Sequence, residues 1–148
     1  MSYRNVVVGT DGSDTAQEAV RQAAEVAKAC GARLTVVTAY TPHPEEVARL
    51  QAEAPEDIAW MLTDAVSAEE RASTGRHLAR ELGLEDVRVR VASGDPAEML
   101  VEAAEDTGAD LIVVGSKGMA SATRFVLGNV PNKVTHHAPC DVMIVHTA

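Results

Sequence analysis

Three glycines and a lysine gather where a predicted strand gives way to a predicted helix. Gly115-Ser116-Lys117-Gly118 follows an apolar run, and Gly128-Asn129 comes after nine further residues. Glycine lets the main chain approach an anion without a Cβ in the way, and the free N–H groups of a starting helix point at that anion. This spacing predicts a phosphate cradle, so nucleotide binding is the leading functional hypothesis. The same glycines can also serve only as a tight connection.

A second short loop carries small and polar residues after another apolar run. Thr10-Asp11-Gly12-Ser13 follows Val6-Val7-Val8, and Ser13, Asp14 and Thr15 each offer a cap for the helix expected next. The carboxylate of Asp11 can bind a ligand or cap that helix, and the two roles are compatible.

The composition restricts the partners of the chain. Its 148 residues match one domain, and the core must be aliphatic because hydrophobic residues make up 46% and aromatic residues 3%. The formal net charge of -9 disfavours nucleic acid and anionic membrane surfaces, which are bound through lysine and arginine. A small anionic ligand remains compatible with this charge, because Lys117 and Arg124 lie in the glycine loop.

No segment approaches the ~20 apolar residues of a membrane span, and the N-terminus leaves no room for a signal peptide, so we expect a cytoplasmic protein.

Cys30 and Cys140 lack the spacing of a zinc site or a disulfide framework and are expected to be buried. His136 and His137 are adjacent on an expected helix, which makes them poor joint ligands, and no metal site is predicted.

Strands and helices alternate along the chain. The expected strands span residues 6–8, 34–39, 87–91, 111–114 and 142–145, and each of the first four is followed by a helix. Residues 41–63, rich in proline, glutamate and alanine, form an insertion between the second strand and its helix, with a short helix expected at 45–54. On the third long helix we expect four buried residues: Ala97, Leu100, Val101 and Ala104.

This alternation predicts a single α/β domain over residues 1–148, a three-layer α/β/α sandwich around a parallel sheet. If the five strands lie in the order 3-2-1-4-5, a ligand binds between the first and fourth strands, where the strand order reverses. The loops 10–13 and 115–129 leave those two strands, so both would border that crevice.

The two loops, placed in this way, resemble the universal stress protein family over essentially the whole chain. The resemblance is carried by four stretches: Val8-Gly9-Thr10-Asp11-Gly12-Ser13, Val113-Val114-Gly115-Ser116-Lys117-Gly118, Leu127-Gly128-Asn129-Val130 and His137-Ala138-Pro139-Cys140. It points to the branch that binds ATP through Gly-x-x-Gly, nine residues and Gly-Ser/Thr. The resemblance implies a Rossmann-like fold and, as ligand, ATP or another adenine nucleotide, with Mg²⁺ able to join through the phosphates.

By that resemblance, Asp11 contacts the ribose or adenine, the backbone near Ala39 meets the adenine edge, and Gly115 and Gly118 lie along the ribose and phosphates. Gly128, Asn129 and Val130 present N–H groups to the phosphates. The complete set of expected nucleotide-binding residues is Thr10, Asp11, Gly12, Ser13, Ala39, Val114, Gly115, Ser116, Lys117, Gly118, Arg124, Gly128, Asn129, Val130 and Pro131.

The chain departs from the family's pattern at two of these positions. Asn129 stands in place of the usual hydroxyl residue, and Pro131, where many nucleotide binders have a second Ser or Thr, offers neither a hydroxyl nor an N–H. These changes weaken the expected contacts to the terminal phosphates and keep open a family member that binds no nucleotide and acts only through protein contacts.

The functional expectation is therefore a stress-response regulator whose nucleotide controls its assembly or its partners. The resemblance also implies a homodimer formed through the last strand, Val142 to Val145. No catalytic residue is expected, although weak ATP hydrolysis can accompany binding. An adenylating enzyme of the ATP pyrophosphatase type is disfavoured, because Gly9-Thr10-Asp11-Gly12-Ser13-Asp14 lacks the Ser-Gly-Gly-x-Asp-Ser loop of those enzymes.

Overall fold

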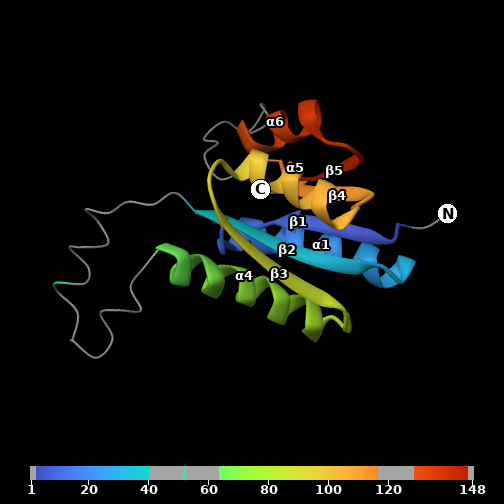
Figure 1. The fold of residues 1–148 in the computed structure, drawn as a ribbon. Coiled ribbons are helices and arrows are strands. Elements are labelled where there is room, and N and C mark those ends of the chain that lie inside the picture. Colours follow the sequence, from blue (N-terminus) through green and yellow to red (C-terminus); the bar gives the residue numbers. More distant parts are fainter. Residues whose placement is uncertain (1–2, 41–51, 53–63, 117–128, 147–148) are drawn as a thin grey trace.

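A computed structural model describes residues 3–40, 52, 64–116 and 129–146. Nine helices and strands lie in these ranges, and they alternate as the sequence predicts (Figure 1). The elements are β1 (Asn5–Gly9), α1 (Asp14–Cys30), β2 (Arg33–Tyr40), α4 (Asp64–Glu81), β3 (Val87–Ser93), α5 (Pro96–Thr107), β4 (Leu111–Gly115), α6 (Asn129–His137) and β5 (Asp141–Val145). The expected helix at 45–54 lies outside the described residues except for Ala52.

The strands form one parallel sheet in the order β3-β2-β1-β4-β5, which confirms the predicted topology. β1 is central and pairs with β2 on one side, where Val8 is opposite Val36, and with β4 on the other, where Val8 is opposite Val113. The strand order therefore reverses between β1 and β4. Because all strands run the same way, their carboxyl ends and the loops that leave them lie along one edge of the sheet.

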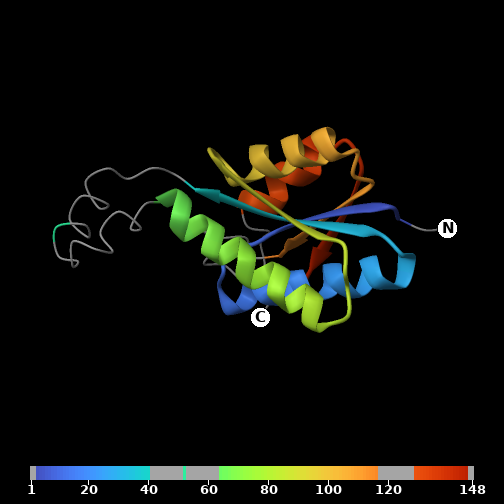
Figure 2. The same cartoon turned by 60° about the horizontal axis from the view of Figure 1, so that its bottom comes forward.

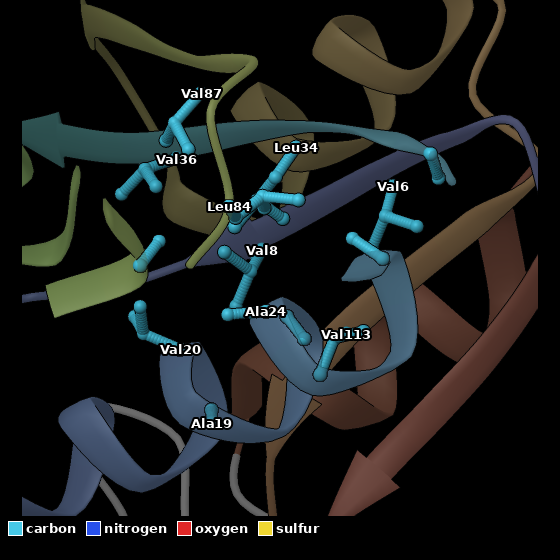
Figure 3. Packing of buried hydrophobic residues seen from close by; sticks show 14 of the residues in the cluster. Val6, Val8, Ala19, Val20, Ala24, Leu34, Val36, Leu84, Val87 and Val113 are labelled. Atoms are coloured by element: carbon cyan, nitrogen blue, oxygen red, sulfur yellow. The ribbon is translucent and has the colours of Figure 1, made fainter. Parts of the chain in front are cut away.

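Two hydrophobic clusters cover the two faces of the sheet. Val6 and Val8 pack with α1 and α4 on one face, whereas Val7 packs with α5 and α6 on the other. Figure 2 shows α1 and α4 together on one side of the sheet and α5 and α6 on the other. In the first cluster small alanines of α1 lie close beneath the valines of the strands (Figure 3), which suits a core almost without aromatic residues.

The helix ends follow local sequence signals. Ser13 caps α1 and Asp95 caps α5, with Pro96 at the first helical position, while Gly31 and Gly108 end these helices at φ of 67° and 68°. These positive φ values are the left-handed conformation that glycine adopts without strain.

Two expectations about burial were wrong. On α5 the buried residues are Ala97, Leu100, Ala103 and Ala104, while Val101 is only half-buried. Val101 lies about 100° around the helix from Leu100, at the border of the stripe that faces the sheet, whereas Ala103 lies within it. Cys30 and Cys140 are half-buried free thiols at the margins of the two clusters.

Candidate functional site

A hollow lies at the carboxyl ends of β1 and β4, the place where the strand order reverses. Its volume is about 440 Å³ with its opening to solvent included. Parallel α/β sheets bind ligands at such switch points. The residues lining this β1–β4 hollow are Gly9, Thr10, Asp11, Ser13, Thr15, Ala16, Leu100, Val114, Gly115 and Val130.

Close packing between β1 and α5 forms one wall of the hollow. A Cβ placed on Gly9 would lie 3.0 Å from Cδ1 and 3.2 Å from Cδ2 of Leu100, whose side chain is 2% exposed. An alanine at position 9 would therefore need the Leu100 side chain to shift by a few tenths of an ångström. Leu100 was not among the expected site residues, because it comes from a helix distant in sequence.

The chain leaving β1 is fastened to β2. The N–H of Thr10 donates to the carbonyl oxygen of Val37 at 3.0 Å, and the hydroxyl of Thr38 donates to the carbonyl oxygen of Thr10 at 2.9 Å. Thr10 is 3% exposed and Thr38 is 1% exposed. The first residue of the loop is thus held on its β2 side by two hydrogen bonds in a dry environment.

The rest of this loop forms bonds within itself. The N–H of Gly12 donates to Oγ1 of Thr10 at 3.1 Å, and the N–H of Ser13 donates to Oδ1 of Asp11 at 2.9 Å. Oγ of Ser13 then accepts the N–H of Ala16 at 3.2 Å, which makes Ser13, among the three expected candidates, the cap of α1. One carboxylate oxygen of Asp11 thus supports the loop, and no hydrogen bond within the described residues uses the other.

An arginine from α4 packs against the back of this loop. Gly12 has a φ of +83°, and a Cβ there would lie 2.8 Å from Cγ of Arg71. Nη1 of Arg71 donates to Oγ of Ser67 at 3.0 Å, and its Nε is buried without a partner in the described part of the chain. Arg71 is not part of the lining of the hollow.

The second loop enters the site from β4. Gly115 ends the strand and lines the hollow, and the N–H of Ser116 donates to the carbonyl oxygen of Val145 at 2.7 Å, which ties the start of the loop to β5. Val130 at the start of α6 also lines the hollow. The buried Pro131 is the third residue of α6, in the first turn, where a helix leaves N–H groups without intrahelical partners.

The structure brings six of the expected binding residues together in the hollow: Thr10, Asp11, Ser13, Val114, Gly115 and Val130. Gly12, Ser116 and Pro131 are next to lining residues in the sequence, and Ala39 lies near the end of β2, but none of these four lines the hollow. Lys117, Gly118, Arg124 and Gly128 lie outside the described residues, as does the side chain of Asn129. Thr15 and Ala16, in the first turn of α1, line the hollow unexpectedly.

Several other features bear on possible functions. Within the described ranges no cluster of three or more His, Cys, Asp or Glu residues could hold a metal ion, and no helix is long and apolar enough to cross a membrane. His136 and His137 are both exposed, with ring centroids 6.5 Å apart. Burial, together with Asp141 and Asp110, raises the pKa of the Cys140 thiol.

Comparisons with known proteins place the chain in a family. The sequence matches the universal stress protein family over residues 2–146. It is 37% identical over 146 residues to universal stress protein Rv1636 of Mycobacterium tuberculosis H37Rv, covering 99% of this chain and 98% of the relative.

Two similar solved structures contain ligands. One is a universal stress protein in complex with cAMP, which matches with a TM-score of 0.74 and 34% identity over 100% of both chains. The other is the universal stress protein from Archaeoglobus fulgidus in complex with dAMP, with a TM-score of 0.69 and 25% identity over 97% of this chain and 98% of that one. The chain described here belongs to the universal stress protein family.

Proposed function

We propose that the chain is an adenine-nucleotide-binding regulator whose ligand occupies the β1–β4 hollow. The observation that carries this proposal is the convergence of Gly9, Thr10, Asp11 and Gly115 on one hollow at the switch point of the sheet. Relatives of 34% and 25% identity are in complex with cAMP and dAMP, which supports an adenine nucleotide as the ligand class.

In this proposal the free oxygen of the Asp11 carboxylate accepts a hydrogen bond from the nucleoside. Gly115, Gly118 and Gly128 let the backbone approach the ribose and phosphates, and Lys117 and Arg124 supply positive charge to ATP, with Mg²⁺ joining through its phosphates. Positive charge is needed because Asp11 is the one ionisable side chain among the described lining residues.

A regulatory role is favoured over catalysis by the kinds of residue in the hollow. Its described lining has the hydroxyls of Thr10, Ser13 and Thr15 and no histidine or cysteine. The Ser13 hydroxyl caps α1 and lies 3.3 Å from that of Thr15, and no hydrogen bond within the described residues joins it to a carboxylate or an imidazole. ATP hydrolysis, where it occurs, would therefore be slow.

Calorimetry with nucleotide-free protein tests the proposal. ATP, AMP, cyclic AMP and adenosine are titrated separately, and ATP is measured with and without Mg²⁺. Asp11→Asn keeps the oxygen that accepts the Ser13 N–H and removes the charge, whereas Asp11→Ala removes both. We expect weaker binding in both variants, with the larger loss in Asp11→Ala, and unchanged binding in Asp14→Asn, an exposed acid in the first turn of α1. Absence of binding by the native protein to all four ligands would sink the proposal and favour action through protein contacts alone.

A second part of the proposal concerns assembly in the cytoplasm. β5 has one neighbour among the described strands, and Ile144 on it is 36% exposed, so an apolar strand edge is open to a second copy of the chain. We propose a homodimer through Val142 to Val145, with its stability altered by the nucleotide. In light scattering at micromolar concentration Ile144→Asp should give a monomer, while Arg88→Asp on the opposite edge strand should leave the dimer intact. A native monomer with and without nucleotide would exclude this assembly.

A further inference from the structure

Thr38 is a buried polar residue in a strand that is otherwise apolar over most of its length. Its hydroxyl donates to the carbonyl oxygen of Thr10, 28 residues earlier in the sequence, at 2.9 Å. The regular pairing of β1 with β2 ends at Gly9 opposite Val37. The Thr38 hydroxyl therefore extends the attachment of the chain to β2 by one residue, into the loop that borders the hollow.

This bond fixes the orientation of the next peptide group. In a trans peptide the carbonyl oxygen of one residue and the N–H of the following residue point in opposite directions. The carbonyl oxygen of Thr10 faces β2, so the N–H of Asp11 faces away from β2. Because β1 lies between β2 and β4, that direction leads to the β4 side, where the hollow lies.

The Asp11 N–H differs from the two amides that follow it. The N–H of Gly12 is bonded to Thr10 and the N–H of Ser13 to the Asp11 side chain, while the N–H of Asp11 has no partner within the described residues. An unpaired backbone N–H at a pocket is available to donate a hydrogen bond to a ligand. Without that hydrogen bond, the N–H would be left unpaired once the ligand excludes water, which costs free energy.

We propose that the backbone N–H of Asp11 donates a hydrogen bond to the nucleoside part of the bound nucleotide, and that Thr38 is the positioning residue that aims it. The inference rests on the proposed function. It adds a specific donor atom to the site and a role for a residue that does not line the hollow. The nucleoside is the partner because the side chain of this same residue is the one proposed to contact it.

Two substitutions on β2 separate this role from a general effect on the core. Thr38→Val keeps the shape of the side chain and removes the hydroxyl, and Thr38→Ser keeps the hydroxyl. Thr35→Val is the matched control, because Thr35 lies on the same strand, is 5% exposed and donates no side-chain hydrogen bond within the described residues.

Affinities for adenosine, AMP and ATP are measured by calorimetry for each variant. Thr38→Val should bind all three more weakly by a similar factor, about three- to tenfold for one hydrogen bond. Thr38→Ser and Thr35→Val should stay within about twofold of the native protein. The equal loss for all three ligands reflects a contact to the part of the molecule that they share.

Amide NMR of the native protein provides a readout that a purely structural role of Thr38 would not change. Adenosine should move the Asp11 amide proton downfield and slow its exchange with solvent, and Thr38→Val should reduce this shift. The experiment also decides the matter if Thr38→Val does not fold, since an Asp11 amide that exchanges equally fast with and without bound adenosine would overturn the inference.

The other outcomes are distinguishable. If the native protein binds no nucleotide, the proposed function fails, and this inference with it. If the native protein binds but Thr38→Val behaves like Thr35→Val, the inference alone fails. A loss confined to ATP would also refute it, because the contact would then lie on the phosphates.

Discussion

The contact between Gly9 and Leu100 leads to a prediction about the substitution Gly9→Ala. The added methyl group should lower the free energy of unfolding when Leu100 is present and raise it when Leu100 is replaced by alanine. In Gly9→Ala the three atoms nearest to the new Cβ all belong to Leu100, at 3.0, 3.2 and 3.5 Å. The backbone at Gly9 has no positive φ, so the conformation itself accepts alanine without strain. Steric overlap with Leu100 is then the dominant effect.

The magnitude follows from how little room Leu100 has to move. It is 2% exposed and belongs to the cluster formed by α5, α6 and the sheet. Overpacking a core of this kind costs about 1–3 kcal/mol. Leu100→Ala alone should cost about 2–5 kcal/mol, since it removes a buried side chain and leaves a cavity. In that background Cγ, Cδ1 and Cδ2 of Leu100 are absent, so the methyl group of Gly9→Ala no longer overlaps them, buries about one carbon worth ~0.8 kcal/mol, and restricts the unfolded chain.

Urea unfolding of the native protein, the two single variants and the double variant measures the coupling. Gly9→Ala should lower the free energy of unfolding in the native background and raise it in the Leu100→Ala background, a coupling of about 2 kcal/mol or more for residues in direct contact. The slope of the transition should stay constant, which shows that the unfolded states are comparable. Additive effects within about 0.5 kcal/mol would refute the reasoning, because Leu100 would then not be the obstacle to a Cβ at position 9.

Three further predictions concern the ends of the elements. Ser13→Ala should destabilise the protein by about 1 kcal/mol, because the N–H of Ala16 loses its cap, and thermal unfolding would measure this. The hydrogen bond from Tyr3 to Asp141 raises the pKa of the Tyr3 phenol above its ordinary value of 10.0. The stability that this hydrogen bond contributes is therefore complete below pH 10.0 and is lost as the pH rises through the pKa of the folded state. The difference in Tm between the native protein and Tyr3→Phe should therefore disappear at strongly alkaline pH, and a constant difference would contradict the assignment. Because the pKa of Cys140 is raised, its thiol should react with iodoacetamide at pH 8 more slowly than free cysteine, and an equal or faster rate would show that the thiolate is not disfavoured.

The parts of the fold that could be predicted are those with local causes. The apolar run at Val6 to Val8 predicted a strand, and the structure places Val7 against one helix layer and its neighbours against the other. The Asp95-Pro96 pair is a local signal for the start of α5, because an N-cap and a proline without N–H suit the first turn of any helix. Each of these signals acts over a few residues.

Burial on α5 shows where this local reasoning fails. Hydrophobicity favoured Val101 over Ala103, but the covered stripe is set by the direction in which the helix lies on the sheet. Leu100 lies in the centre of that stripe, Ala103 lies about 60° from it on one side, and Val101 lies about 100° from it on the other. The deciding quantity is the rotation of the helix about its own axis against the sheet, which the sequence of the helix alone does not contain.

The site has the same division between local and distant causes. The glycine, aspartate and serine of the first loop can be recognised as candidate binding residues from their residue types. The resemblance to a known family supplies their expected roles. Thr38 gives no such signal, because threonine is an ordinary strand residue and Thr35 on the same strand is also buried. What separates the two is that the chain leaving β1 passes within reach of one hydroxyl and not the other. That difference arises only when β1 and β2 pair in register, so a residue that aims a donor at the hollow is distinguishable from its neighbour in the folded structure alone.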